Sequence, residues 1–343
     1  MTRTLLVTGG GGVGKTTVSA ALGVAAARSG IRTLVVTVDP ARRLADALGI
    51  ELQGADPSPL AEEPNLWAAM LDASQSWNTL ARTHADPEAA DRLVGNPFFA
   101  AATSHFPASQ SFAAAEEATR FVEGGAWELV VVDTPPSAGG IEFFTAPAEM
   151  TALVGGRLLR WLTGGRLPGR RFLFNRTAKP ALRIADNVLG SDLLEQIAQF
   201  LMDLRTTYDG VAARSREIEA RMRTATSIVV TTADPSPVRE AVRFYRELPA
   251  VATRPAAVVF NRTLPEEWID ARPGRVAAEY AENLRRWGAE AQRQRDLRVE
   301  FAGRYRTELT TIPWRPHAPT DLDSLADLVS SAEGFDPVGL LGP

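Results

Sequence analysis

The chain has 343 residues, of which 45% are hydrophobic and 23% are charged, and its formal net charge at pH 7 is −4. This balance is typical of a soluble globular protein, and the acidic charge gives no general attraction to nucleic acid or to anionic membranes. The chain has no cysteine and three widely spaced histidines, which excludes disulfides and thiolate chemistry and leaves no ligand spacing for a metal cluster.

The N-terminal residues enter a strand at once, without the charged and apolar segments of a signal peptide. No uninterrupted apolar run approaches the ~18–20 residues that a membrane-spanning helix requires. We therefore expect a cytoplasmic location and no integral membrane segment.

Short apolar runs of strand length recur along the chain, separated by stretches with helical spacing. Near-continuous apolar strands of this kind are typical of a parallel sheet that is covered by helices. We predict an α/β fold with a mostly parallel twisted sheet of about seven strands and helices on both faces. The predicted strands are residues 4–9, 33–39, 66–71, 128–133, 227–234, 256–261 and 309–314.

Two intervals between these strands, about 73–127 and 140–226, are longer than a crossover requires. The second contains helical patterns at 192–204 and 212–225. We predict a single domain over 1–343 in which both intervals form an inserted helical subdomain. In residues 142–175, aromatic and aliphatic side chains alternate with arginines. This pattern suits an ordinary core face, and it also suits a groove for an apolar client helix or contact with a membrane surface.

The glycine-rich run after the first strand, Gly9 to Thr16, matches the phosphate-binding pattern G-x-x-x-x-G-K-[ST] between a strand and a helix. Backbone N–H groups and the helix N-terminus hold phosphate oxygens there, the lysine reaches the β- and γ-phosphates, and the Thr16 hydroxyl binds Mg²⁺. The same glycines fit the dinucleotide pattern G-x-G-x-x-G, with Asp39 as ribose ligand, but that site does not need Gly-Lys-Thr. The predicted nucleotide ligands are Gly10, Gly11, Gly12, Val13, Gly14, Lys15, Thr16 and Thr17, and Lys15 is also a candidate catalytic residue.

Two acidic residues stand at the ends of predicted strands, where ligands bind in parallel sheets. Asp39, in "VVTVDPARRLAD", is the candidate catalytic residue that orders and polarises the attacking water. A helix cap is the alternative role for Asp39. Asp133, in "ELVVVDTPPSAGG", is the candidate Mg²⁺ ligand, usually through water. We predict a magnesium site formed by Thr16, Asp133 and Asp39.

The segments "GGGGVGKTT", "VDPARRLAD" and "VVDTPPSAGG", in this order, resemble the arsenite-pump ATPase (ArsA) family, which includes the eukaryotic ATPase that delivers tail-anchored membrane proteins. The likeness continues through "SIVVTTADPSPVREAVRFYREL", "AAVVFNR" and "TIPWRPHAPTDLDSLADL", and so covers most of the chain. The resemblance implies ATP and Mg²⁺ as cofactors and a homodimer with facing nucleotide sites. It also implies nucleotide-gated binding and release of a protein client or membrane-transport partner, with Asn261 at the adenine edge and Pro313 and Trp314 beside the base.

The chain departs from this family at two points. The lysine that such ATPases commonly carry early in the loop is replaced by Gly10, which excludes cross-subunit activation by that residue. Arg42 or Arg43 is a candidate substitute, because a guanidinium stabilises transition-state charge, although residues of a solvated surface are the favoured interpretation of both. Without cysteine, the thiols that bind arsenite or interfacial zinc in family members are absent, so the chain is most similar to a bacterial branch lacking both features.

Two other functions fit the loop. A partition or positioning ATPase of the ParA/MinD class would bind DNA or membrane through a basic patch or an amphipathic tail, and the acidic charge and the C-terminal "GFDPVGLLGP" disfavour it. No nucleic-acid partner is therefore expected. A nucleotide-binding scaffold with little turnover is the second alternative.

Overall fold

The computed structural model describes residues 2–39, 43–52, 55–105, 108–135, 138–156, 191–272, 274, 278–307 and 309–334. The chain divides into two compact units. The first comprises Met1–Leu71, Glu117–Phe144 and Arg221–Pro343, and the second comprises Asp72–Glu116 and Thr145–Ala220.

The first unit is built on an eight-stranded sheet in the order β3-β4-β2-β5-β1-β6-β7-β8. Neighbouring strands pair in parallel except β3 and β4, which are antiparallel. The predicted α/β fold is confirmed, and all seven predicted strands are present. The unpredicted strand β3 is a three-residue edge strand that contains Pro59 and lacks an apolar run. The strands are β1 Arg3–Gly9, β2 Thr33–Thr37, β3 Ser58–Leu60, β4 Glu63–Met70, β5 Leu129–Asp133, β6 Thr226–Thr231, β7 Ala257–Thr263 and β8 Leu309–Pro313.

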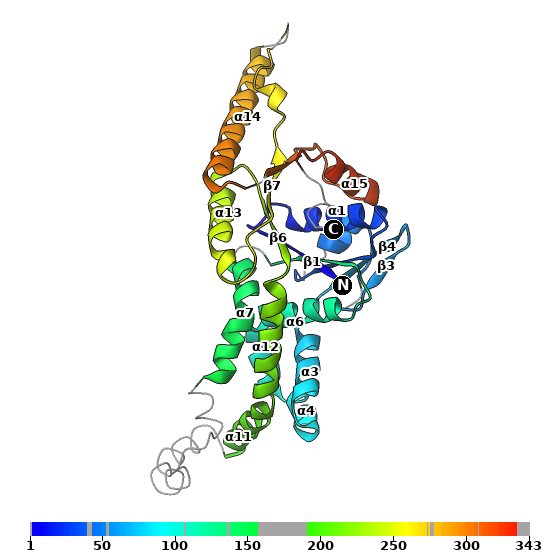
Figure 1. Cartoon of the computed structure of the whole chain (residues 1–343), viewed down its shortest axis with the longest axis vertical. Coiled ribbons are helices and arrows are strands. Elements are labelled where there is room, and N and C mark those ends of the chain that lie inside the picture. The colour runs from blue at the N-terminus through cyan, green and yellow to red at the C-terminus, as the bar shows by residue number, and fades with distance from the viewer. Residues whose placement is uncertain are drawn as a thin grey trace. The chain divides into compact units, whose positions relative to one another are not determined.

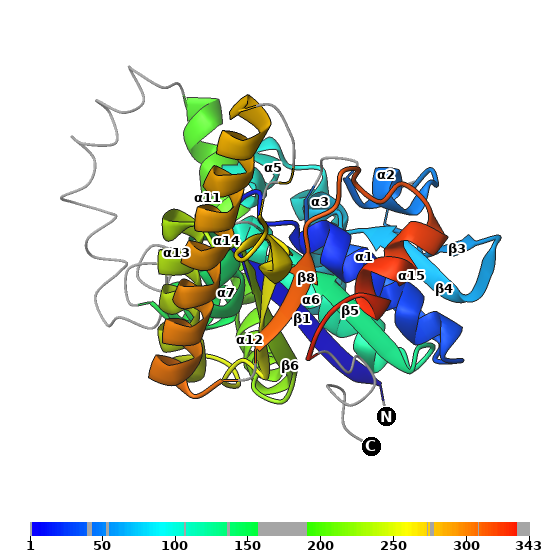
Figure 2. The same cartoon turned by 90° about the horizontal axis from the view of Figure 1, so that it is seen from above.

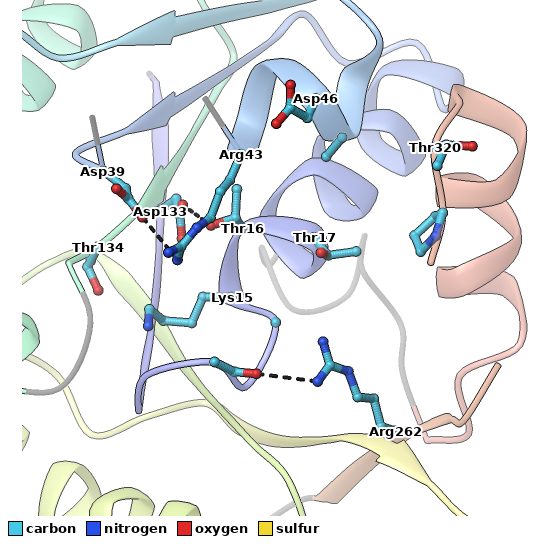
Figure 3. Close-up of a pocket in the computed structure, with 14 residues that line it drawn as sticks. Lys15, Thr16, Thr17, Asp39, Arg43, Asp46, Asp133, Thr134, Arg262 and Thr320 are labelled. Atoms are coloured by element: carbon cyan, nitrogen blue, oxygen red, sulfur yellow. Dashed lines mark hydrogen bonds and ion pairs between the residues drawn. The ribbon is translucent and has the colours of Figure 1, made fainter. Parts of the chain in front are cut away.

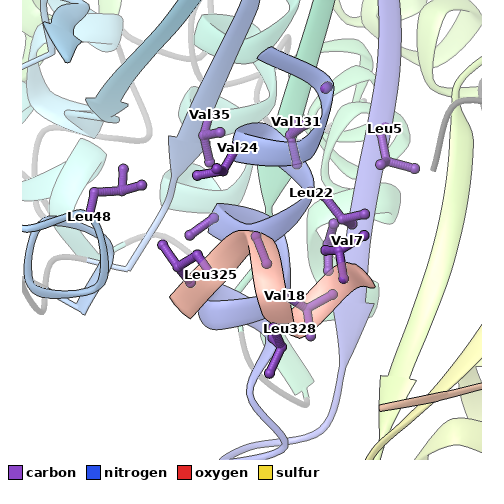
Figure 4. Close-up of a cluster of buried hydrophobic side chains, with 14 of the residues drawn as sticks. Leu5, Val7, Val18, Leu22, Val24, Val35, Leu48, Val131, Leu325 and Leu328 are labelled. Atoms are coloured by element: carbon purple, nitrogen blue, oxygen red, sulfur yellow. The ribbon is translucent and has the colours of Figure 1, made fainter. Parts of the chain in front are cut away.

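Alternate side chains of the central strands enter separate layers on the two faces of the sheet. On one face lies helix α1 (Lys15–Arg28), with α15 (Leu322–Ser330) and the short α2 (Arg43–Leu48) packed beside it (Figure 2). The apolar residues of this layer form one cluster, which includes Leu5, Val7, Val18, Leu22, Val35, Val131, Leu325 and Leu328 (Figure 4). Small side chains let α1 approach closely, since a Cβ added to Gly23 would lie 2.2 Å from Val35 Cγ2.

The opposite face of the sheet is covered by α13 (Pro235–Glu247) and α14 (Ala278–Tyr305), which lie on the other side of β6 and β7 from α1 in Figure 1. The ring of Phe260 on β7 meets Phe301 on α14 at a centroid distance of 5.7 Å. The 3₁₀ turns are η1 (Leu248–Ala250) and η2 (Glu266–Trp268). Because both faces carry helices, the central strands are buried throughout, which explains their near-continuous apolar sequences.

The second unit is helical. Arg92 donates two hydrogen bonds to the buried carboxylate of Asp203, at 2.9 and 2.7 Å, and Arg214 pairs with Glu116. The leucine-rich and charged stretches predicted to be helical form α11 and α12. Helices α6, α7 and α12 each cross from one unit to the other in sequence. The helices are α3 Ala73–His84, α4 Pro87–Val94, α5 Pro97–His105, α6 Ser109–Glu123, α7 Ala138–Gly155, α11 Ser191–Thr206 and α12 Tyr208–Met222.

The second unit comprises Asp72–Glu116 and Thr145–Ala220, so apart from residue 72 it lies within the predicted insertions 73–127 and 140–226. Most of the stretch in which aromatic residues alternate with arginines lies outside the described residues, which resume at 191. Among its described large apolar members, Phe143, Phe144, Met150 and Val154 are buried, whereas Leu153 is 38% exposed. Among the helices described, none is both long and apolar enough to cross a membrane.

Candidate nucleotide site

The loop between β1 and α1 adopts backbone conformations that favour glycine. Gly14, the N-cap of α1, has φ 93° and ψ 24°, which lie in the left-handed region. A Cβ at Gly9 would lie 2.1 Å from the backbone oxygen of Val230 on the neighbouring strand. The sequence pattern therefore reflects a tight turn that directs the loop over the carboxyl ends of β1 and β6.

Lys15, the first residue of α1, is buried, with 7% of its surface exposed, and its Nζ donates a 2.8 Å hydrogen bond to the Gly10 carbonyl. Burial lowers the pKa of Lys15, whereas the negative charges of Asp133, Glu240 and Asp39 raise it. The ammonium group is thus held inside the loop among carboxylates, at a place where a polyphosphate would supply stronger compensation.

Asp133, at the end of β5, accepts hydrogen bonds at Oδ2 from the hydroxyls of Thr16 (2.7 Å) and Thr37 (2.9 Å). The residue is 2% exposed, and this burial raises the pKa of its carboxyl group, opposed by the two hydroxyl hydrogen bonds and by Lys15. Its other oxygen, Oδ1, is buried and accepts no hydrogen bond from the described residues. An orphaned carboxylate oxygen beside a hydroxyl fits Mg²⁺, which prefers oxygen ligands.

Among the described residues, no group of three or more His, Cys, Asp or Glu side chains is placed to hold a metal. A protein cage for a metal is therefore not present in this part of the chain. Mg²⁺ commonly takes one or two protein oxygens and completes its shell with water and substrate phosphates. The pair formed by Thr16 and Asp133 matches that mode of binding.

Asp39 follows β2 and forms an ion pair with Arg43, whose Nη1 lies 3.2 Å from Asp39 Oδ2 (Figure 3). The backbone N–H of Asp39 donates to the Thr37 hydroxyl at 3.2 Å. Arg43 is one of the two arginines suggested as substitutes for the missing loop lysine, and the structure brings it to the site. The other, Arg42, lies outside the described residues.

These groups line a cavity of about 500 Å³, a size typical of small-molecule sites (Figure 3). Of the predicted site residues, Gly12, Gly14, Lys15, Thr16, Thr17, Asp39 and Asp133 line it. Sequence reasoning missed the remaining lining residues apart from Arg43: Asp46, Ala47, Thr134, Arg262, Pro319 and Thr320. Arg262 directly follows Asn261, and the last two belong to the quoted segment "TIPWRPHAPTDLDSLADL", so neighbouring residues were recognised without them.

Asn261, predicted to read the adenine edge, is 5% exposed and packs on the loop. Its Nδ2 donates to the Val13 carbonyl at 2.9 Å, and its Oδ1 accepts from the Arg262 N–H at 2.9 Å. The cavity lining does not include Asn261, Pro313 or Trp314 among the described residues. The backbone N–H of Trp314 donates to the Thr263 carbonyl at 2.8 Å, and the exposed ring of Trp314 lies 6.4 Å from that of Trp268. The three base-contact assignments stay predictions.

The position of the missing lysine has its own structural context. A Cβ added to Gly10 would lie 2.2 Å from Oε2 of Glu240, a residue of α13. The loop therefore carries a glycine against an acidic side chain where family members commonly carry a cation. Gly10, Gly11 and Val13 do not line the cavity within the described part of the chain.

The glycine loop between a strand and a helix, the buried lysine, and the Thr16–Asp133 pair on a mostly parallel sheet define the class of P-loop nucleotide-binding ATPases. The sequence matches the family model described as anion-transporting ATPase (ArsA_ATPase) over residues 2–286. The chain belongs to this family of ATPases, and the predicted resemblance is confirmed.

Individual relatives are similar to most of this chain, and two of the three named here are ATPases by name. The chain is 29% identical to the uncharacterized protein SCO2128 of Streptomyces coelicolor, over 98% of this chain and 77% of that protein. It is 25% identical to a putative arsenical pump-driving ATPase of Chlorobaculum tepidum, over 76% of this chain and 61% of that protein. It is 24% identical to ATPase get3 of Aspergillus terreus, over 76% of this chain and 73% of that protein. The match thus spans less than two thirds of the Chlorobaculum protein.

Proposed function

We propose that this ATPase hydrolyses ATP with Mg²⁺ and uses the cycle to bind and release a client, working as a homodimer. The observation that carries the chemistry is the buried carboxylate of Asp133, which holds the Thr16 hydroxyl and keeps one oxygen without a described partner. It lies in a cavity with Lys15, so a cation and a cation-binding acid are available to one triphosphate.

The residues of the site divide the work between binding and hydrolysis. Lys15 and the loop amides bind the β- and γ-phosphates, and Thr16 and Asp133 hold Mg²⁺, the latter directly or through water. When bound, Mg²⁺ neutralises charge on the phosphates. Asp39 orients the attacking water and accepts its hydrogen bond, and Asp39 also contributes to the magnesium shell through water.

Arg43 is the cation that this chain offers near the γ-phosphate in place of the absent loop lysine. Its guanidinium pairs with Asp39 at 3.2 Å, and 64% of its side chain is exposed. Exposure leaves the guanidinium able to turn towards a developing phosphate charge, which an arginine stabilises well. Asp39 then has two roles: it orients the attacking water, and its negative charge balances the positive charge of Arg43.

The coupling to a client rests on the path of the chain and on the relatives. Helix α7 follows Asp133 and the segment after it, and it continues into the second unit. A change at the γ-phosphate would therefore act on a helix that both units share. The Chlorobaculum relative is named a putative arsenical pump-driving ATPase, but because this chain has no cysteine we propose a protein client or a membrane-transport partner.

Phosphate release and ATP binding, measured on four proteins, test the enzymatic part. Wild type should release phosphate only with Mg²⁺, Asp39→Asn should bind ATP but lose turnover, and Lys15→Glu should lose binding. Asp323→Asn, an exposed acid outside the cavity, should behave as wild type. ATP binding without any phosphate release from wild type would favour a non-hydrolysing scaffold.

Molar mass in solution, measured with Asp39→Asn in the presence of Mg-ATP, tests the homodimer. A monomer at every protein concentration would contradict it. Proteins that co-purify with Asp39→Asn in ATP but not in ADP test the client. Recovery of the same proteins in both nucleotides would contradict nucleotide gating.

A further inference from the structure

Arg262, on β7, has a backbone conformation that arginine rarely adopts. Its φ is 58°, in the left-handed region, and only three described non-glycine residues share a positive φ. Such a conformation is unfavourable for a side chain with a Cβ and persists where surrounding contacts hold it. Here the Asn261 Oδ1 accepts a 2.9 Å hydrogen bond from the Arg262 N–H and thereby fixes the turn.

This turn directs the Arg262 side chain into the nucleotide cavity. Figure 3 shows the guanidinium on the side of Thr17 and Thr320, whereas Asp39 and Asp133 stand at the opposite side. Its Nη1 lies 3.4 Å from the Gly12 carbonyl. That distance exceeds the usual range for an N–H···O hydrogen bond, so the contact is weak and a ligand can replace it.

The two ends of the cavity differ in chemistry. The end with Lys15, Thr16 and Asp133 has the groups that phosphates and Mg²⁺ require. The other end is bordered by Arg262, by the ring of Pro319 and by Thr320. When a triphosphate occupies the first end, the second end of the same cavity is open to the rest of the nucleotide.

A guanidinium is planar, is weakly hydrated and stacks on aromatic faces, and a proline ring offers an apolar surface of similar extent. We propose that Arg262 stacks on the face of the adenine base and, with Pro319, clamps it. The proposal rests on the proposed function, because it assumes that the site binds ATP. It makes Arg262 a positioning residue for the base, in a place where family resemblance pointed to Asn261, Pro313 and Trp314.

Calorimetric titration of the full chain with Mg-ATP and with Mg-tripolyphosphate separates the base from the phosphates. In Arg262→Ala, ATP binding should weaken about fivefold to thirtyfold, as expected for a desolvated cation–π contact, and tripolyphosphate binding should change less than twofold. Arg262→Gly, which suits the positive φ, should show the same selective loss. Arg285→Ala removes an exposed arginine of α14 that pairs with Glu282, and it should bind both ligands as wild type does.

The outcomes are distinct. An equal loss of both ligands in Arg262→Ala and Arg262→Gly would overturn the clamp and place the guanidinium on the phosphates. Normal ATP binding by Arg262→Gly would also overturn it, because the backbone turn alone would then suffice. Wild type that binds tripolyphosphate as tightly as ATP overturns the clamp and leaves the proposed function standing, whereas wild type that binds neither overturns both.

Discussion

A substitution at position 10 of the phosphate loop tests whether Glu240 is the reason that this chain has glycine there, where its family commonly has lysine. The change is Gly10→Ala, made in wild type and in Glu240→Ala. A Cβ at Gly10 would lie 2.2 Å from Glu240 Oε2, well under the 3.0 Å that Cβ contacts respect. The two residues are far apart in sequence and belong to the loop and α13, so they are coupled through the tertiary structure and not through the chain.

The magnitude follows from the contact and from the backbone. When Gly10→Ala is made in the protein that keeps Glu240, the Glu240 carboxylate must move away from the new Cβ. Because the tip of that side chain is flexible, we expect the free energy of unfolding to fall by only about 1–2 kcal/mol. Gly10 is not among the glycines with positive φ. In Glu240→Ala the same change should therefore raise the free energy of unfolding by about 0.4–1 kcal/mol, as alanine does at a compatible glycine position.

Urea unfolding of the four proteins, followed by tryptophan fluorescence without nucleotide, gives the coupling free energy. We expect about 2 kcal/mol, with the effect of Gly10→Ala changing sign between the two backgrounds. Effects that add within about 0.5 kcal/mol would refute the reasoning, because the glycine would then be independent of Glu240. Coupling of the expected size would show that a side chain at position 10 requires a change in α13.

Three further predictions concern charged groups. Asp133→Asn should weaken Mg-ATP binding about 10-fold to 100-fold, since a neutral amide lacks the negative charge with which a carboxylate holds Mg²⁺ or its bound water; calorimetry with and without Mg²⁺ checks this, and an unchanged magnesium dependence would contradict it. Burial, with the positive charge of Arg214, lowers the pKa of His84, so wild type should lose stability as pH falls below the unfolded value of 6.5. His84→Gln should show a smaller loss in urea unfolding at pH 7 and 5, and parallel losses would disprove this. Arg214→Met should reduce stability by about 3 kcal/mol by breaking its buried pair with Glu116, while exposed Arg216→Met should change little; similar losses would exclude a specific pair.

The phosphate end of the site could be predicted from the sequence because its parts are contiguous. A strand, five small residues, Lys15 and Thr16 form a turn whose geometry depends on neighbours in the chain. The ends of two further apolar strands then supply Asp39 and Asp133, since parallel strands bring their carboxyl ends to one edge. The strands themselves were recognisable because helices cover both faces and leave almost no polar positions.

The base end could not be predicted in the same way. Pro319 and Thr320 reach the cavity from the loop after β8, and Arg262 enters it through a backbone turn that no propensity suggests. Glu240 lies against Gly10 and belongs to a helix more than two hundred residues later in the chain. The sequence of the glycine-rich loop therefore did not indicate this contact. The edge strand β3 was missed because three residues with a proline carry no apolar pattern.

The sequence by itself determined that this chain is an α/β P-loop ATPase of the ArsA family, because those properties depend on short contiguous motifs and on residue periodicity. Tertiary structure decided which side chains that are distant in sequence meet around the site: Thr37 with Asp133, Asn261 with the Val13 carbonyl, and Glu240 with Gly10. These contacts depend on how helices pack on the sheet, and packing fixes distances that spacing along the chain does not record.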